Sequence, residues 1–181
     1  MQPFTTVLTR EKVVVPAKSE ADSLINDGYG NIVNGLIELE PTEVLYNVER
    51  GKIIVLNEET GKSLYFNELL QLFLGLDPKS WTRFLVYKDL RTRGFVTRRD
   101  TTLRTDLVVY ERGCLNKEQP TISVAIVSEG SPESLEWLLE LAQSTEKEGL
   151  QLKLAVVDRR GEIVYYSLSE RKFSDVIHQP I

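Results

Sequence analysis

The side chains that most often carry out chemistry in enzymes are scarce in this chain. Its 181 residues include one histidine, His178, and one cysteine, Cys114. His178 lies close to the C-terminus, where chains are usually poorly held, so a Ser/His/Asp triad or a histidine-rich metal site would lack a well-placed imidazole. We expect His178 to belong to a tail or an interface. A lone cysteine excludes an intramolecular disulfide and a metal site built from several cysteines.

Basic side chains gather in one short region of the sequence. Five arginines fall within fourteen residues, namely Arg91, Arg93, Arg98, Arg99 and Arg104. Such a run could contact a phosphate backbone, or it could be a solvated surface that pairs with Asp89, Asp100 and Asp106. Both interpretations stay open. The formal net charge is −5, so any binding of nucleic acid has to be local rather than an effect of bulk charge.

Apolar spacing and turn residues predict a compact first unit that could position such side chains. Strands are expected at residues 12–16 and 52–56, and helices at residues 19–27, 41–51 and 64–74. Pro41 stands where the start of a helix tolerates proline, and Gly28-Tyr29-Gly30 breaks the chain. The last of these helices has so many apolar residues that we expect it to be well buried.

A second unit is expected to begin near residue 76, because Asp77 can cap a helix with Pro78 at its first position. Strands are expected at residues 95–96, 107–110, 122–127, 150–157 and 163–168. The tight connection at residues 158–161 indicates that the last two strands form an antiparallel hairpin. The sequence therefore predicts an α+β chain with domains at residues 1–75 and 76–181.

One long helix is expected between the strands of the second unit. Ser131 reads as its N-cap and Pro132 as its first residue. Its predicted apolar face holds Leu135, Leu138, Leu139 and Ala142. No apolar run approaches the roughly 18 residues of a membrane span, and residues 1–15 lack the long apolar stretch of a secretion signal. We expect a cytoplasmic protein with no membrane partner.

Three stretches carry a recognisable pattern over residues 28–168. They are Gly28-Tyr29-Gly30 with LIELEPTEVLYNVERGKIIV (residues 36–55), VYKDLRTRGFV (86–96) with TDLVVY (105–110), and LAVVDRRGEIVYYSL (154–168). In order and spacing, the sequence resembles the archaeal tRNA-splicing endonuclease family. The first stretch is similar to the family's N-terminal domain, with Val44 in place of an alanine. The second is similar to the entry into the nuclease domain, and the third to that domain's closing hairpin.

This resemblance implies a small N-terminal mixed α/β domain followed by a restriction-endonuclease-like C-terminal domain, acting on precursor tRNA in a four-subunit assembly. Members of the family cut bulge-helix-bulge structures without metal or cofactor and leave a 2′,3′-cyclic phosphate. They use a triad in which tyrosine activates the 2′-hydroxyl, histidine is the general acid, and lysine stabilises the charge of the phosphorane.

The sequence departs from the family at this triad. Tyr110 matches the tyrosine, but the histidine position falls on or beside Pro120 and the lysine position around Leu150 or Gln151. Proline cannot transfer a proton, and the other two side chains are uncharged at neutral pH. Lys153 is close but would occupy a different strand position. We therefore expect no catalytic residue, and Tyr110 to be a core residue with its hydroxyl at the rim.

The resemblance then implies a structural subunit of a heterotetrameric archaeal splicing endonuclease, inactive alone, with a separate catalytic chain as its partner in a two-plus-two arrangement. In the family, an acidic loop between the last two long strands inserts into a basic pocket of the catalytic subunit. The matching loop here is Asp158, Arg159, Arg160, Gly161 and Glu162. The segment around Val176 and Ile177 is expected to pair with a partner chain through main-chain hydrogen bonds.

Two other functions stay open. A metal-dependent nuclease of the restriction-endonuclease-like fold would use an acid on one strand and a lysine on another, as Asp106 and Lys153 superficially do. One carboxylate is, however, few for a Mg²⁺ site. The chain could also be a degenerate nuclease fold that serves as a binding module outside tRNA splicing, which would form a stable homodimer and ignore the catalytic chain.

Overall fold

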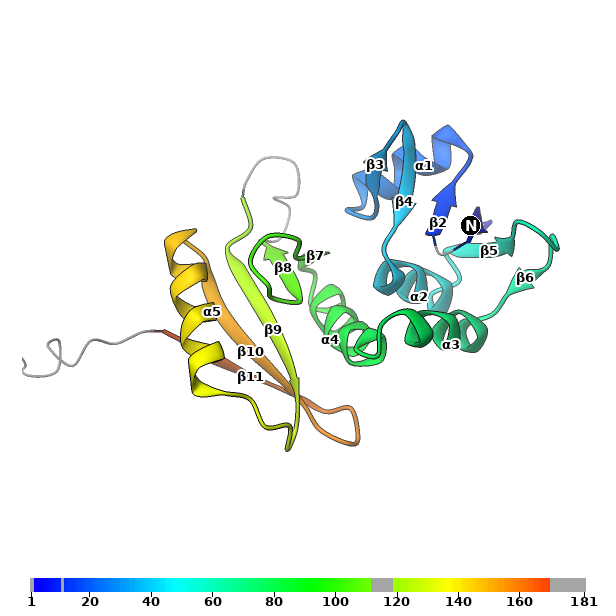
Figure 1. Cartoon of the computed structure of the whole chain (residues 1–181). Helices are drawn as coiled ribbons and strands as arrows, with labels where there is room; N and C mark the ends of the chain where they lie inside the picture. Colours follow the sequence, from blue (N-terminus) through cyan, green and yellow to red (C-terminus); the bar gives the residue numbers. More distant parts are fainter. Residues whose placement is uncertain (1, 11, 112–118, 170–181) are drawn as a thin grey trace, which may run out of the picture. The chain divides into compact units, whose positions relative to one another are not determined.

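The computed structural model describes residues 2–10, 12–111 and 119–169, which Figure 1 draws in colour. Contacts divide the chain into two compact units, Met1–Thr97 and Arg98–Ile181. The predicted α+β class is confirmed, because helices accompany two sheets of mixed strand direction. The predicted domain boundary near residue 76 lies inside the first unit. Units defined by contacts and domains defined by sequence need not coincide, so this boundary stays a prediction.

A six-stranded sheet organises the first unit. Its strands are β1 (Phe4–Thr9), β2 (Lys12–Val15), β3 (Asn31–Val33), β4 (Leu36–Leu39), β5 (Ile53–Asn57) and β6 (Ser63–Leu64). They lie in the order β3-β4-β2-β1-β5-β6, in which β1 and β5 are parallel and the other neighbours antiparallel. The sequence analysis assigns no strand before residue 12, yet β1 lies in the middle of the sheet. Its three threonines favour a strand but blur the apolar alternation that would reveal one.

Four helices belong to the first unit: α1 (Lys18–Asn26), α2 (Pro41–Glu49), α3 (Phe66–Leu76) and α4 (Ser80–Thr92). The central one is α2, which contacts α3, α4 and β5. The expectation that α3 is well buried is wrong. Within α3, Leu69 and Phe73 are the buried residues, while Tyr65 at its N-cap is 73% exposed. A helix that packs along one side leaves its remaining apolar residues near the surface.

One buried carboxylate ties the start of α2 to the Gly28-Tyr29-Gly30 segment. Glu43 is 2% exposed, and its Oε2 accepts hydrogen bonds from the backbone N–H of Glu40 at 3.0 Å and of Gly30 at 2.9 Å. A Cβ at position 30 would lie 2.6 Å from Cγ2 of Ile37, and the φ angle of +76° is itself unfavourable for other residues. The motif therefore requires glycine at position 30.

A five-stranded sheet organises the second half of the chain. Its strands are β7 (Val96–Arg99), β8 (Leu107–Tyr110), β9 (Ile122–Ser128), β10 (Gln151–Val157) and β11 (Ile163–Leu168). They lie in the order β11-β10-β9-β8-β7. Strands β9 and β10 are parallel and are joined through helix α5 (Leu135–Lys147), whereas β8 and β9 are antiparallel. The predicted hairpin of β10 and β11 is confirmed.

Helix α5 packs along one face of this sheet (Figure 1), where Leu141 and Ala142 join Ala125 of β9 and Leu152 of β10 in a buried cluster. The helix begins at Leu135, not at Pro132, because the hydroxyl of Ser134 accepts a hydrogen bond from the N–H of Trp137 and caps the first turn.

The predicted face of α5 is confirmed at Ala142, which is buried, but it is wrong at Leu135 and Leu139, which are 71% and 42% exposed. The stripe that packs runs instead through Trp137, Leu141 and Ala142. Both stripes contain apolar residues at helical spacing, so only packing against the sheet decides between them. Among the described residues, no helix combines the length and apolar character needed to cross a bilayer.

Candidate functional site

The three positions implied by the family triad lie at one end of the second sheet. Val109 of β8 is paired with Ile122 of β9, and Ile122 with Gln151 of β10. The N–H of Thr121 donates to the carbonyl of Val109 at 3.0 Å, and the N–H of Gln151 donates to the carbonyl of Thr121 at 3.0 Å. The strand ends that carry Tyr110, Pro120 and Leu150 are therefore neighbours, as the family's spacing requires.

The side chains at these neighbouring positions are unsuited to acid–base chemistry. Because successive strand residues alternate between faces, Tyr110 and Leu150 belong to the face on which α5 packs, and Gln151 to the opposite face. Tyr110 and Leu150 are half-buried, and Gln151 is exposed. At the positions that the resemblance implies for the lysine and the histidine, Leu150 and Gln151 are uncharged and Pro120 has no proton to give.

The alternative metal site is not assembled. Lys153 is paired with Val124, and Val124 with Leu107, so these three residues belong to one face of the sheet. Asp106, which precedes Leu107, belongs to the opposite face because successive strand residues alternate between faces. Lys153 Nζ donates to Ser167 Oγ at 2.6 Å, and Asp106 Oδ2 accepts from the N–H of Ile126 at 2.8 Å. Across residues 2–10, 12–111 and 119–169, no three His, Cys, Asp or Glu side chains are placed to hold a metal ion together.

The loop before β8 is organised by Asp100, which is 9% exposed. Its Oδ1 accepts from the N–H of Thr102 at 2.8 Å and of Leu103 at 3.1 Å, and its Oδ2 accepts from the Thr105 N–H at 3.0 Å and hydroxyl at 2.6 Å. The Thr105 hydroxyl also contacts the Ser123 hydroxyl at 2.6 Å. Burial disfavours the charge of Asp100, but these hydrogen bonds together hold its pKa below the usual value. Residues 100–105 thus form a defined loop before β8.

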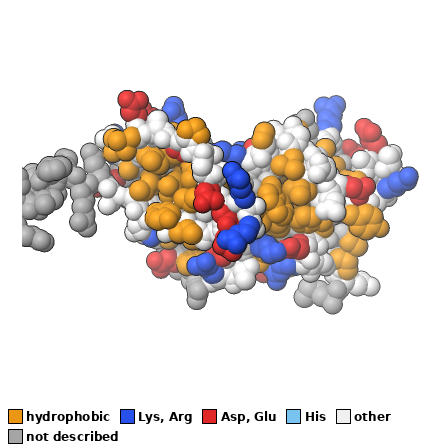
Figure 2. All heavy atoms as spheres, turned by 90° about the horizontal axis from the view of Figure 1, so that it is seen from below, with side chains coloured by type: hydrophobic (Ala, Val, Ile, Leu, Met, Phe, Trp, Pro, Cys, Tyr) orange, Lys and Arg blue, Asp and Glu red, His pale blue; other side chains and the backbone are white. Residues whose placement is uncertain are grey.

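The five arginines predicted as weak RNA contacts lie in different settings. The guanidinium of Arg91 stacks 4.2 Å from the ring centre of Tyr29 and donates to the carbonyl of Asp27 at 2.8 Å. Arg93 pairs with Asp89 at 3.0 Å. Arg98 and Arg99 belong to β7 and Arg104 to the loop of Asp100. On the face that Figure 2 shows, acidic and basic side chains lie side by side rather than in one basic patch.

Two of the recognised sequence stretches meet through Arg91. Gly28-Tyr29-Gly30 supplies the ring and VYKDLRTRGFV supplies the guanidinium. Tyr87, four residues before Arg91, is fully buried, and burial, with the charge of Glu43 adding to it, raises the pKa of its hydroxyl well above the usual value. These strings therefore act within the first unit as packing elements, a role that sequence alone leaves unassigned.

The predicted partner-binding loop, residues 158–162, is a tight turn built around Asp158. The Oδ1 atom of Asp158 accepts from the N–H of Arg160 and of Glu162, both at 2.8 Å. The hydrogen bond from Glu162, followed by that from Arg160, lowers the pKa of Asp158. Arg160 also lies 3.4 Å from carboxylate oxygens of both acids. Asp158 is thus occupied within its own turn, whereas the side chains of Arg160 and Glu162 are 78% and 69% exposed.

Four residues named in the sequence analysis lie outside the described residues: Cys114, Val176, Ile177 and His178. The sequence analysis also did not identify Trp137 as a residue on the packing face of α5, because it assigned that face to a neighbouring stripe of the helix. Its one available signal was the helical spacing from Trp137 to Leu141.

Comparison with known proteins finds family matches for both the N-terminal and the C-terminal part of the chain. Residues 4–70 match the N-terminal domain, and residues 80–165 the catalytic C-terminal domain, of tRNA intron endonucleases. The chain is 34% identical to a tRNA-splicing endonuclease of Thermococcus onnurineus over 180 residues, 95% of this chain and 99% of the relative. It is 30% identical to that of Methanococcus vannielii over 168 residues, 91% of this chain and 93% of the relative.

A third relative differs in length. The tRNA-splicing endonuclease of Methanococcoides burtonii is 31% identical over 175 residues, which are 96% of this chain but 48% of that relative. The chain belongs to the tRNA intron endonuclease family.

Proposed function

We propose that this chain is the non-catalytic, structural subunit of a tRNA-splicing endonuclease that cuts bulge-helix-bulge introns out of precursor tRNA. The observation that carries the proposal is the row of strand ends at Tyr110, where Pro120 and Leu150 stand at the neighbouring positions. Cleavage by attack of a 2′-hydroxyl needs a group that accepts a proton, one that donates a proton, and a cation near the phosphorane. Among the described residues at these strand ends, the phenol of Tyr110 is the one group suited to proton transfer.

The contribution of the chain to cleavage is then orientation. Two copies of it, with two copies of a catalytic chain, hold both active sites at a fixed separation, so that both cleavage sites of one folded RNA are engaged together. Positioning of reacting groups supplies a large part of many enzymatic rate enhancements. A family member that lost two triad groups keeps this role as long as it keeps its fold.

Residues 158–162 are our candidate contact with the catalytic chain. Asp158 fixes the shape of the turn from within, so the charge offered to a partner comes from Glu162 and the two arginines. A loop with charges of both signs favours specific pairing over long-range attraction. This assignment differs from a simple acidic loop, because the Asp158 carboxylate acts through the shape of the turn.

The test is cleavage of a bulge-helix-bulge RNA in EDTA by this chain, by the catalytic chain, and by their mixture, with the mass of each species measured in parallel. The proposal predicts full activity in the mixture, at a mass of two copies of each chain, and none from this chain alone. Activity of this chain alone in EDTA, or only after Mg²⁺ is added, would overturn it. A stable homodimer that leaves the catalytic chain unbound would make it a binding module outside splicing.

A further inference from the structure

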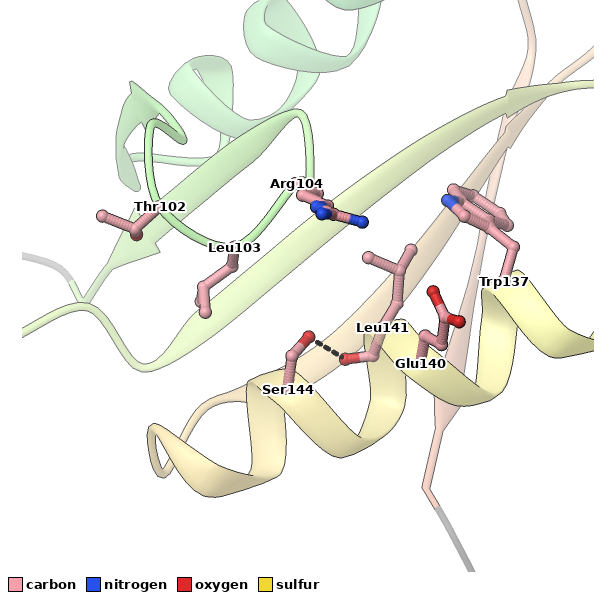
Figure 3. A pocket seen from close by; sticks show the side chains of 7 residues that line it. All are labelled: Thr102, Leu103, Arg104, Trp137, Glu140, Leu141 and Ser144. Carbon is pink, nitrogen blue, oxygen red and sulfur yellow. Dashed lines mark hydrogen bonds between the residues drawn. The ribbon is translucent and has the colours of Figure 1, made fainter.

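A hollow of about 240 Å³ lies between helix α5 and the loop that Asp100 organises. Leu103 and Arg104 line it from the loop, and Trp137, Glu140, Leu141 and Ser144 line it from the helix. Figure 3 shows Arg104 reaching from the loop over Leu141 towards Trp137. All of these residues belong to the second unit, and the hollow lies on the face of the sheet to which Tyr110 belongs.

Arg104 is held in place by its backbone. Its φ angle of +60° lies in the left-handed region, which non-glycine residues seldom adopt because the Cβ atom is crowded there. The hydrogen bonds from Thr102, Leu103 and Thr105 to Asp100 enclose this residue on both sides and enforce its conformation. Strained backbone of this kind persists where the surrounding structure over-determines it, and it gathers at functional sites.

The walls of the hollow offer a specific set of interactions. Trp137 is half-buried and offers an indole face, Leu103 and Leu141 offer apolar surface, and Arg104 offers a planar cation. Glu140 offers a carboxylate that can only accept hydrogen bonds. The hydroxyl of Ser144 already donates to the carbonyl of Leu141 at 3.0 Å. An aromatic face, a guanidinium plane and a hydrogen-bond acceptor are the groups with which proteins hold an unstacked base.

We propose that this hollow binds one unpaired nucleobase that carries an exocyclic amino group, stacked between Trp137 and Arg104 and donating to Glu140. This inference rests on the proposed function, which makes RNA the ligand of the assembly. The volume is below the roughly 300–1,000 Å³ of sites for drug-sized ligands, so it suits a base rather than a whole nucleotide. The carboxylate of Glu140 would repel a phosphate group at the same place but accepts the N–H of a base.

The test follows the fluorescence of Trp137 in a Trp81→Phe background, so that a single indole reports. The probes are short single strands of adenylate, cytidylate and uridylate, and an RNA duplex. We expect adenylate and cytidylate strands to quench Trp137 and to bind at least about fivefold more tightly than uridylate, because uracil lacks the amino group. The duplex should leave the emission unchanged.

Two variants with matched controls locate the site. Arg104→Gln should weaken binding of the adenylate strand about tenfold by removing one stacking plane, whereas Arg10→Gln, at an exposed arginine that also has a positive φ of 51°, should not. Glu140→Ala should abolish the preference over uridylate, whereas Glu136→Ala, on the first turn of the same helix, should keep it. Equal binding of all strands and of the duplex, or no effect of Arg104→Gln, would overturn the proposal.

The same signal separates this inference from the proposed function. If Trp137 emission changes on addition of the catalytic chain without RNA, the hollow is a protein contact and the nucleobase proposal is wrong. If no RNA strand quenches Trp137 but the mixed complex still cleaves its substrate, the base site fails while the structural-subunit role stands. A mixture that neither assembles nor cleaves would contradict the role itself, whatever the strands do.

Discussion

Tyr110 matches the tyrosine of the triad that the family resemblance implies, whereas the residue types at the positions implied for the histidine and the lysine differ. The position of Tyr110 could be predicted from the sequence, because the spacing within TDLVVY is kept. The resemblance also implied a histidine position on or beside Pro120 and a lysine position around Leu150 or Gln151. The sequence could not show that Leu150 shares the face of Tyr110 while Lys153 belongs to the opposite one, because that depends on the register of three strands.

The phenol of Tyr110 can therefore be removed at little cost. Tyr110→Phe should leave the cleavage rate of the assembled enzyme within about twofold, whereas loss of a working general acid or base costs roughly 100-fold or more. Single-turnover cleavage by the mixed complex measures this, with thermal unfolding as the check on folding. A hundredfold loss in a variant that folds and assembles normally would show that Tyr110 is catalytic.

Asp100 is the residue on which the shape of the loop before β8 depends. Asp100→Asn should destabilise the second unit by roughly 2 kcal/mol, because the amide nitrogen would replace one of the two accepting oxygens and so face the donors of either Thr105 or Thr102, which are otherwise satisfied. Urea unfolding monitored through the fluorescence of Trp137 in a Trp81→Phe background measures the effect. Asp22→Asn, an exposed carboxylate on α1, is the control and should change little.

The same variant has a defined pH dependence. The pKa of Asp100 is lower in the folded chain than in the unfolded one, so the unfolded chain binds the proton more readily. The stabilisation is therefore complete above the unfolded pKa of about 4 and is lost as the pH falls through the lower folded value. The stability difference between the wild type and Asp100→Asn should be constant at neutral pH and shrink below about pH 4. A difference independent of pH down to pH 2 would contradict this.

At the scale of elements, local sequence patterns predicted helices and turns better than they predicted how the elements pack against one another. Helix α2 was predictable from Pro41 and Gly51, and the hairpin of β10 and β11 from its charged turn. Strand β1 was missed because polar threonines interrupt its pattern, and the packing face of α5 was assigned to a neighbouring stripe. In both cases the local sequence is compatible with two arrangements, and contacts with residues far apart in the sequence determine which one forms.

Gly30 provides a test of how α2 is attached to its sheet. Gly30→Ala meets Cγ2 of Ile37 at 2.6 Å in addition to its unfavourable φ, and we expect a loss of roughly 3 kcal/mol. Gly35→Ala is a matched control, because Gly35 has a similar φ of +81° with no heavy atom within 4 Å of the added Cβ. It should lose only about 1 kcal/mol. Equal losses by urea unfolding would mean that the close approach to Ile37 has no energetic role.

The β10–β11 turn allows shape and charge to be separated. Glu162→Gln should weaken association with the catalytic chain about three- to tenfold and reduce its salt dependence, because an exposed charge is lost. Asp158→Asn should stay within about twofold, since the amide oxygen can still accept from Arg160 and Glu162, whereas Asp158→Ala should weaken association by loosening the turn.

Binding titrations of the folded variants with the catalytic chain measure these effects. If Asp158→Asn weakens association as much as Asp158→Ala does, the partner recognises the charge of Asp158 and not the shape of the turn. If Glu162→Gln has no effect at low salt, the loop is not the contact that we propose.

At the scale of the whole molecule, the chain matches both domains of tRNA intron endonucleases, with residues 4–70 in the N-terminal match and residues 80–165 in the match to the catalytic C-terminal domain. The fold does not require the chemistry of the triad, because the packing of buried residues of the second sheet, such as Leu107, Val124 and Ala155, does not depend on the side chains at the strand ends.

The proposed function is tested most directly by measuring cleavage by a complex in which this chain is wild type and the triad of the catalytic chain has been inactivated by substitution. The complex should still form with two copies of each chain, and it should not cut a bulge-helix-bulge RNA, in EDTA or with Mg²⁺. Restoring the triad in the partner should restore cleavage completely. Cleavage by the complex with the inactivated partner would contradict the account, because it would place an active site in this chain.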